Sequence, residues 1–320
     1  MKLRIPDYVC LYTDKAEELL NAELKNELNG KDGKVVFELT DGGLRVFATT
    51  YEKGARYIKL RWNEPVRKDI KVLGDAYERG YGDLQWDTIK PERMMPWYIA
   101  VSNGSDACLD YKGRFTECFG VMVQPNAMCF WQYDTKGVTL WLDIRNGGNG
   151  TLLNGRMLEC ATVVFSEYRD TSAYYALQDF SGVMSPNPYL PKHKVYGSNN
   201  WYYAYGKSSH EEIIEDSRLV ADMCKGLPNI PYMVIDDGWQ PNPTDAPWDI
   251  GNERFPDMKG LADKMRELGV RPGIWVRYLI NGKDDQERKI TLPEEWYLER
   301  NRKLLDPSRR EVLDYVAGIT

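Results

Sequence analysis

Residues 231–240 read Pro231-Tyr232-Met233-Val234-Ile235-Asp236-Asp237-Gly238-Trp239-Gln240, an apolar run that ends in two carboxylates, a glycine and a tryptophan. A short apolar run closed by turn residues predicts a strand that is buried on both faces. Because charges do not stay in such an interior without partners, we expect Asp236 and Asp237 at the carboxyl end of the strand, where the chain leaves the sheet. In a parallel α/β barrel, that end carries the active site.

The side chains of Asp236, Asp237 and Trp239 suit a sugar-binding edge. Carboxylates accept hydrogen bonds from vicinal hydroxyls, and an indole ring packs against the apolar C–H face of a pyranose. The alternative is a helix N-cap followed by a turn glycine, which has only a structural role. Taken alone, the pair fits both interpretations equally, so the surrounding sequence has to decide between them.

Strands and helices alternate through residues 195–320. The sequence predicts strands at 195–205, 231–236 and 273–279, and helices at about 209–225, at about 257–268 and from Asp306-Pro307 onward. Ser209 and Glu212 form a capping box, and Asp306 is an N-cap followed by proline. This order predicts a parallel sheet with right-handed crossovers, either a small open α/β sheet or the first three βα units of a (β/α)8 TIM barrel, which needs ~250 residues in full.

Residues 1–182 have the pattern of an antiparallel β-sandwich domain with an N-terminal helix. The helix is predicted over residues 14–28, because Asp14 and Glu17 can form a capping box and leucines recur at helical spacing. Short strands separated by turn residues are predicted at 34–39, 44–49, 57–62, 97–102, 119–124, 128–132, 138–144 and 160–167. Prolines within residues 183–194 mark a linker to the second domain.

Three predicted strands carry side chains that suit a sugar ligand. Trp201 lies on the first strand, Asp236 and Asp237 end the second, and Trp275 lies on the third. If the strands are adjacent and parallel, these groups converge on one pocket. Packing inside a barrel explains Trp201 or Trp275 alone as well as sugar binding does, but the coincidence of all three favours a binding site.

Composition excludes several classes of function. A formal net charge of −6 argues against a surface for nucleic acid or for an anionic membrane, and no apolar run is long enough to span a bilayer. The N-terminal residues lack the apolar segment of a secretory signal, so we expect a cytoplasmic protein, with a removed signal peptide left open.

Cysteine and histidine are too sparse for metal or thiol catalysis. The six cysteines show no Cys-X-X-Cys pair, and the histidines are only His193 and His210. We therefore expect buried free thiols in a reducing compartment, no metal and no other cofactor. Any catalysis is expected to use carboxylates. The cysteines are Cys10, Cys108, Cys118, Cys129, Cys160 and Cys224.

Several motifs resemble glycoside hydrolase family 36, the retaining α-galactosidases, over both the sandwich and the barrel portions. The motifs are Asp236-Asp237-Gly238-Trp239-Gln240, Asn252-Glu253-Arg254-Phe255-Pro256, Gly273-Ile274-Trp275 and Leu305-Asp306-Pro307. The upstream segments Trp201-Tyr202-Tyr203-Ala204-Tyr205-Gly206 and Trp141-Leu142-Asp143-Ile144-Arg145-Asn146-Gly147-Gly148 resemble a bacterial branch of the family.

The resemblance implies a β-sandwich joined to a (β/α)8 barrel that hydrolyses terminal α-galactosides. By similarity, Asp236 and Asp237 bind galactose hydroxyls, the axial one included, and Trp239 helps to form the pocket wall. Trp201 and Trp275 are implied, more weakly, at the pocket floor.

The catalytic residues are expected outside this sequence. The resemblance implies an Asp nucleophile at the end of the fourth barrel strand and an Asp acid/base at the end of the sixth, both beyond Thr320. Retaining hydrolysis needs two carboxyl groups about 5–5.5 Å apart. Asp236 and Asp237 cannot be that pair, because the side chains of adjacent strand residues diverge to opposite sides.

Two further features concern specificity. Arg277-Tyr278 stands where relatives often have Ala-Pro, and an arginine there would suit a charged or differently substituted sugar. The loop at residues 78–86 is dense in sugar-binding groups, with Asp83 and Trp86 as its expected contacts. A structured hairpin that packs on the barrel explains this loop equally well.

Two functions stay open at this point. The first is a glycoside hydrolase that binds an α-linked galactoside or related oligosaccharide, seen here as its N-terminal portion. The second is a non-catalytic carbohydrate-binding or interaction protein that keeps the sandwich and part of the pocket. The oligomeric state is also open, a homo-oligomer included.

Overall fold

The protein divides into two compact units. The structure is a computed structural model that describes residues 3–15, 17–21, 25–65, 67, 69–76, 84–104, 111–146, 148–241, 248–281, 292–298 and 301–319. Contacts between Cα atoms separate Met1–Pro188 from Tyr189–Thr320. This division falls inside the predicted linker at 183–194, and the independence of the two domains stays a prediction.

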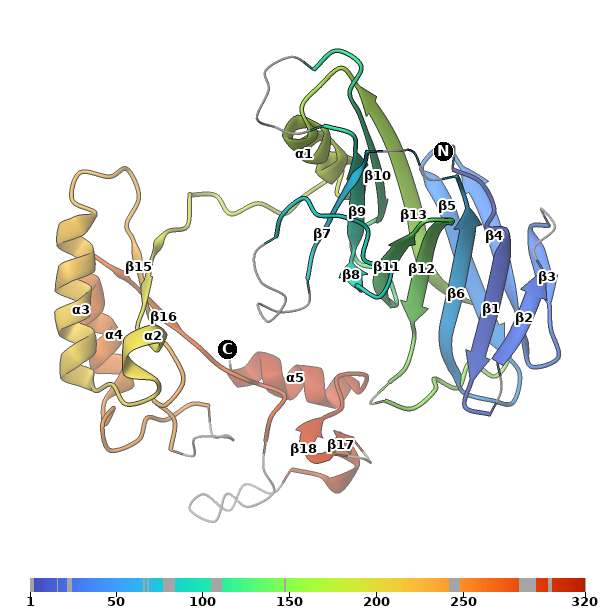
Figure 1. The fold of residues 1–320 in the computed structure, drawn as a ribbon. Helices are drawn as coiled ribbons and strands as arrows, with labels where there is room; N and C mark the ends of the chain where they lie inside the picture. Colours follow the sequence, from blue (N-terminus) through green and yellow to red (C-terminus); the bar gives the residue numbers. More distant parts are fainter. Residues whose placement is uncertain are drawn as a thin grey trace. The chain divides into compact units, whose positions relative to one another are not determined.

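The first unit contains two antiparallel sheets that share one apolar core (Figure 1), which confirms the predicted β-sandwich. The six-stranded sheet has the order β2-β1-β6-β12-β11-β8, with β1 (Tyr8–Thr13), β2 (Glu17–Asn21), β6 (Ala55–Asn63), β8 (Met95–Pro96), β11 (Met128–Asp134) and β12 (Gly137–Asp143). The seven-stranded sheet has the order β3-β4-β5-β13-β10-β9-β7, with β3 (Glu27–Asn29), β4 (Gly33–Thr40), β5 (Gly43–Thr50), β7 (Lys71–Gly74), β9 (Tyr98–Ser102), β10 (Phe115–Val121) and β13 (Leu158–Arg169).

Period-two alternation of side chains builds the core between these sheets. Along β11, every second residue is buried, and Trp131 packs with its ring centroid 6.2 Å from that of Trp62 on β6. Each large apolar side chain buried in this way stabilises the fold by about 1.5–3 kcal/mol. The turn between the strands predicted at 128–132 and 138–144 is also present, because Asp134 pairs directly with Gly137 across a two-residue loop.

The predicted N-terminal helix at residues 14–28 is wrong. The chain there forms β2 and β3, and β2 pairs along its length with β1. Asp14 does not cap a helix, since its carboxylate accepts hydrogen bonds from Arg56 (3.2 Å) and from the backbone N–H of Gly150 (3.1 Å). Cross-strand pairing has overridden the helical spacing of the leucines, because local propensity is weak compared with tertiary contacts.

A helix covers the outer face of the seven-stranded sheet. The helix α1 (Ala173–Met184) begins at Ser172, whose side chain accepts a hydrogen bond from the N–H of Tyr175. Phe180 on α1 is fully buried with Cys118 of β10. The strand β10 is therefore buried on both faces, with Phe119 in the core between the sheets and Cys118 beneath the helix. This helix is absent from the elements predicted from the sequence.

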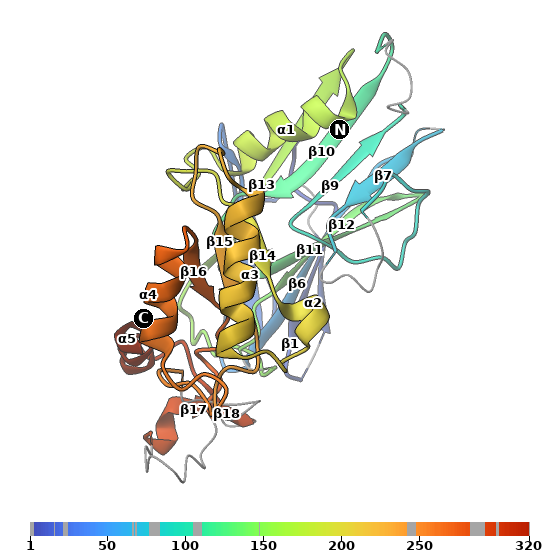
Figure 2. The same ribbon diagram turned by 90° about the vertical axis from the view of Figure 1, so that its left-hand side faces the viewer.

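The second unit is built on a three-stranded parallel sheet in the order β14-β15-β16. Its strands and helices are β14 (Gly197–Asn199), α2 (Trp201–Ala204), α3 (His210–Met223), β15 (Tyr232–Ile235), α4 (Met258–Glu267) and β16 (Arg271–Ile274). Figures 1 and 2 show α3 and α4 side by side, with α3 packed against β15 and α4 against β16. The predicted capping box of Ser209 and Glu212 is present at the start of α3.

Several boundaries in the second unit differ from the predictions. The strand predicted at 195–205 ends at Asn199, so that Trp201 lies in α2, and β16 ends before Trp275. A 3₁₀ turn, η2 (Glu294–Trp296), and the hairpin of β17 (Tyr297–Leu298) and β18 (Asn301–Leu305) precede the last helix, α5 (Arg310–Ile319). The helix predicted from Asp306 begins four residues later, because Asp306 closes a turn by accepting hydrogen bonds from Ser308.

The described thiols are unpaired. Cys10, Cys118, Cys129, Cys160 and Cys224 are free, while Cys108 lies outside the described residues. Burial raises the pKa of the Cys118, Cys129 and Cys160 thiols to about 12, so all three stay protonated at neutral pH. Within the described ranges, no helix is both long and apolar enough to cross a membrane.

We predict that a fragment of residues 1–188 unfolds in one cooperative thermal transition, because the core between the sheets and α1 lies within it. A fragment of residues 1–171, which lacks α1 and the fully buried Phe180, should lose about 3–5 kcal/mol, as a Phe-to-Ala truncation in a core does. Urea unfolding of both fragments measures the difference. Equal stability, or a fragment 1–188 without a cooperative transition, would contradict this boundary.

Candidate functional site

The carboxyl ends of the three parallel strands meet at one edge of the second unit. The ladder pairs Asn199 of β14 with Val234 of β15, and Ile235 of β15 with Ile274 of β16. The residues that follow each strand therefore leave the sheet side by side, which is where ligands bind in open α/β sheets. Asp236 and Asp237 lie at this edge, as the sequence predicts.

The carboxylate of Asp236 is held on the β14 side of the edge. It accepts a hydrogen bond from the side-chain amide of Asn199 and another from the backbone N–H of Asp237 at 2.7 Å. The backbone N–H of Asp236 donates to the side-chain oxygen of Asn200 at 2.8 Å. Asn200 is buried, so its side chain links the ends of β14 and β15 by a hydrogen bond that is shielded from solvent.

The carboxylate of Asp237 faces other partners. One oxygen accepts a hydrogen bond from the side-chain amide of Gln240 at 2.6 Å, and the other lies 3.8 Å from a guanidinium nitrogen of Arg277, which follows β16. The side chains of Asp236 and Asp237 thus contact opposite neighbours. Both residues are partly exposed, so each carboxylate can still accept hydrogen bonds from a ligand.

Arg277 and Trp275 form a stacked pair beside Asp237. The guanidinium carbon of Arg277 lies 4.8 Å from the ring centroid of Trp275, within cation–π range. The side chains of Arg277 and Asp237 are 33% and 23% exposed, so their ion pair is partly screened by water and contributes about 0–1 kcal/mol to stability. Arg277 is therefore placed next to one of the two candidate sugar-binding carboxylates.

Trp239 belongs to the core of the second unit. Its side chain is 2% exposed, its indole N–H donates to the carbonyl of Trp275 at 2.8 Å, and its ring lies 6.1 Å from that of Trp248. In this structure the ring supports the turn that carries the carboxylates. Its predicted contact with a sugar remains a prediction.

A single arginine joins the two loops that follow β14 and β15. One guanidinium nitrogen of Arg254 donates to the carbonyl of Gly206 at 2.7 Å and to that of Gly238 at 2.9 Å. Asn252 donates to the carbonyls of Gly238 and Gln240 at 2.8 and 3.1 Å. These bonds fix the backbone of the turn from Asp236 to Gln240.

The other predicted site residues lie in different surroundings. Trp201 is partly buried in α2, where its backbone N–H donates to the side-chain oxygen of Asn199 and its ring lies 5.6 Å from that of Tyr205. Trp86 is in the first unit, packed against the cluster around Phe180, and Asp83 lies outside the described residues. A contact of Trp86 or Asp83 with a sugar therefore stays a prediction.

The helix that carries Trp201 is anchored to α3. The hydroxyl of Tyr203 donates to Asp216, and burial together with this bond raises the pKa of Tyr203, which stays protonated.

In the described part of the chain, no group of three or more His, Cys, Asp or Glu side chains could hold a metal ion.

Sequence reasoning missed the residues that orient the carboxylates. Gln240, Asn252 and Arg254 lie in the motifs that resemble family 36, and Asn199 lies in the first strand predicted for the second domain, but the sequence assigned no role to them. The available signal was their position, since each is a polar residue near a predicted strand end and a loop there must satisfy its buried backbone groups.

Comparison with known proteins links the sequence to an α-galactosidase. No protein-family model matches the chain. A curated relative, α-galactosidase AgaA of Geobacillus stearothermophilus, is 29% identical over 134 residues, which cover 37% of this chain and 17% of that enzyme.

Solved structures share the fold. A variant of AgaA in complex with 1-deoxygalactonojirimycin matches 99% of this chain and 53% of its own, with a TM-score of 0.51 and 17% identity. The α-galactosidase TtGalA of Thermus thermophilus matches 98% and 63%, with a TM-score of 0.52 and 16% identity. The galactosidase domain of the α-galactosidase–sucrose kinase AgaSK matches 99% and 48%, with a TM-score of 0.53 and 17% identity.

These comparisons show what the chain is similar to. It resembles an α-galactosidase in sequence over 37% of its length, and it shares the fold of parts of family 36 α-galactosidases over nearly all of it. The chain spans about half to two-thirds of the length of these solved structures, with 53%, 63% and 48% covered.

We predict that Gly238→Ala destabilises the second unit more than Gly226→Ala. Both glycines have positive φ, 104° at Gly238 and 86° at Gly226. A Cβ at Gly238 would lie 2.3 Å from the carbonyl oxygen of Gly206, whereas a Cβ at Gly226 would meet no atom within 4 Å. The backbone term should cost about 1–2 kcal/mol at either position. The clash should add about 1–3 kcal/mol at Gly238 alone. Urea unfolding measures the loss of stability in each variant. Equal losses of unfolding free energy would show that the two loops do not need this close approach.

Proposed function

We propose that this chain is the N-terminal portion of a retaining glycoside hydrolase that acts on terminal α-galactosides. In this proposal it supplies the β-sandwich, the first three βα units of a TIM barrel and part of the sugar-binding pocket. The observation that carries the proposal is the pair Asp236 and Asp237, oriented by Asn199 and Gln240 at the carboxyl ends of parallel strands.

The roles that we assign to the two carboxylates are in substrate binding. A pyranose that lies across the strand ends presents vicinal hydroxyls, and each carboxylate can accept at least one of them in a charge-assisted hydrogen bond. Asp236 and Asp237 turn to different neighbours, so together they span two hydroxyl positions rather than one. By the resemblance to family 36, we assign to them hydroxyls of the galactose ring, the axial one included.

The catalytic pair must come from other residues in this proposal. Retention requires a nucleophile and an acid/base about 5–5.5 Å apart on either side of the glycosidic bond. Asp237 is already engaged by Gln240 and Arg277, and Asp236 by Asn199, so both are held as acceptors beside the ring. We assign nucleophile and acid/base to later barrel strands.

The edges of the parallel sheet support its extension into a barrel. Among the described strands, β14 and β16 each pair only with β15. Apolar side chains flank both sides, with Leu219 at 59%, Met223 at 75% and Ile274 at 42% exposure. Apolar surface beside an unpaired strand edge suits packing against further strands and helices.

Relatives indicate the substrate class. A variant of AgaA has been solved with raffinose and TtGalA with stachyose, and both are α-galactosidases. We extend this class, α-galactoside oligosaccharides, to the present protein. Arg277 beside Asp237 adds one positive charge to the proposed pocket, which would suit a charged or otherwise substituted sugar ring.

We predict that the 320-residue chain alone does not hydrolyse an aryl α-galactoside. A longer protein that contains this chain and the remaining barrel strands should hydrolyse it and release galactose with retained anomeric configuration. Nitrophenol release and proton NMR of the first product measure the two properties. Turnover by the pure 320-residue chain, scaling with its concentration, would contradict the assignment of catalysis to later strands. A longer protein that binds galactose without cleavage would instead favour the non-catalytic alternative.

A further inference from the structure

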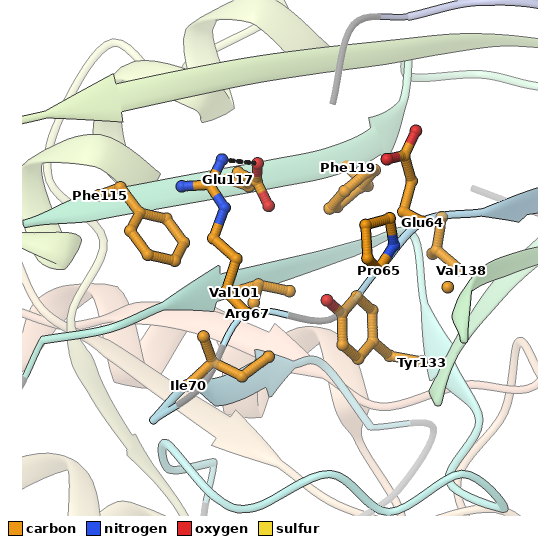
Figure 3. A pocket seen from close by; sticks show the side chains of 11 residues that line it. Glu64, Pro65, Arg67, Ile70, Val101, Phe115, Glu117, Phe119, Tyr133 and Val138 are labelled. Atoms are coloured by element: carbon orange, nitrogen blue, oxygen red, sulfur yellow. Dashed lines mark hydrogen bonds and ion pairs between the residues drawn. The ribbon is translucent and has the colours of Figure 1, made fainter. Parts of the chain in front are cut away.

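A cavity of about 230 Å³ lies at one end of the core between the two sheets of the sandwich (Figure 3). Side chains from β9, β10, β11 and β12 and from the segment that follows β6 line it, and all of them belong to the first unit. Its walls are partly apolar, with Val101, Phe119 and Val138 among them. Three polar side chains, Arg67, Glu117 and Tyr133, point into it together (Figure 3).

Glu117 occupies a position in β10 that the strand pattern reserves for apolar side chains. Its neighbours at the same face, Phe115 and Phe119, are buried aromatic residues, and Glu117 itself is 7% exposed. A carboxylate at such a position is costly unless it is paired. Arg67 pairs with it at 3.1 Å and stacks on Phe115, with 4.2 Å between the guanidinium carbon and the ring centroid. A well-packed apolar residue would serve stability at least as well.

Tyr133 provides an independent observation. Its side chain is 7% exposed and lines the cavity, and its hydroxyl is not among the fully buried polar atoms that lack a partner. A phenol hydroxyl at a cavity wall can donate a hydrogen bond to a ligand or to water. Burial, followed by the nearby charge of Glu117, raises the pKa of Tyr133 to about 12. The hydroxyl therefore stays a hydrogen-bond donor that faces the cavity at neutral pH.

The charges around the cavity select against anions. Glu64 pairs with Arg4 at 3.5 Å and Glu117 with Arg67 at 3.1 Å, so no described side chain of the lining offers an unpaired cation to a negatively charged ligand. A ligand that both donates to a carboxylate and accepts from a phenol and a guanidinium must carry several hydroxyls. Its remaining surface must be apolar C–H groups that pack against the aromatic and aliphatic walls.

We propose that this cavity binds a neutral, hydroxyl-rich molecule of monosaccharide size. The volume of about 230 Å³ is smaller than the ~300–1,000 Å³ that drug-sized ligands occupy, and suits one sugar ring. The ligand enters past Arg67, whose side chain is 40% exposed while that of Glu117 is 9% exposed. This site is separate from the proposed galactoside pocket and uses none of its residues.

The test uses the whole 320-residue chain carrying Asp237→Asn, so that the strand-end site of the second unit is weakened. Calorimetric titration with galactose and glucose should give one saturable site, and galacturonate should bind at least tenfold more weakly. Adding Tyr133→Phe should weaken binding roughly threefold to tenfold, which is the loss of one neutral hydrogen bond. The melting temperature should change little, because the hydroxyl faces the cavity and the ring that fills the core is kept.

Tyr98→Phe is the matched control. Tyr98 also lies in the sandwich, but it packs on the α1 side of β9, and its loss of a hydroxyl should leave affinity unchanged. Absence of saturable binding of either sugar would overturn the proposal and leave a cavity that holds water only. The proposal is also overturned if the variant with Tyr133→Phe binds sugar as tightly as its parent. A lower melting temperature of that variant would overturn it too, because the phenol would then have a structural role.

Discussion

The hydrogen bonds from Arg254 to the carbonyls of Gly206 and Gly238 hold the edge of the second unit together. They join the loops after β14 and β15 at a point where the two backbones approach too closely for any side chain at Gly238. The planar guanidinium holds the two N–H groups of one nitrogen at a fixed angle, so the two carbonyls are fixed relative to each other. The positions of Asp236 and Asp237, and hence the proposed sugar site, depend on this bridge.

The strands and helices of the parallel sheet were predictable because the sequence patterns that indicate them are local. Ser209 and Glu212 cap α3 as their spacing indicates, and the apolar run before Asp236 forms β15. The N-terminal helix failed for the opposite reason. Leucines at helical spacing after Asp14 were outweighed by pairing with β1, a long-range contact that no local pattern reveals. The boundary errors near Trp201 and Asp306 arise where side chains close turns with the backbone.

The candidate site was predictable in its carboxylates but not in what surrounds them. A pair of aspartates after an apolar strand must leave the sheet, since burial without partners is costly. The burial of Trp239 and the approach of Arg277 to Asp237 depend on the packing of three strands and could not be read from spacing. In the sandwich, Glu117 faces the core from a position of β10 where the neighbouring side chains are apolar. The sequence gives no reason for this carboxylate, whereas the structure shows that it lines a cavity.

The central claim is that Asp237 binds a sugar hydroxyl, and Asp237→Asn tests it in a protein that contains the whole barrel. Calorimetric titration with galactose should show affinity reduced roughly ten- to a hundredfold, the range that corresponds to ~1.5–3 kcal/mol for a charged acceptor. The melting temperature should change little, because asparagine keeps an oxygen for Gln240. Asp263→Asn, on the exposed face of α4, should alter neither property. Unchanged galactose affinity together with a clear loss of stability would contradict the claim and leave Asp237 as a residue of the turn alone.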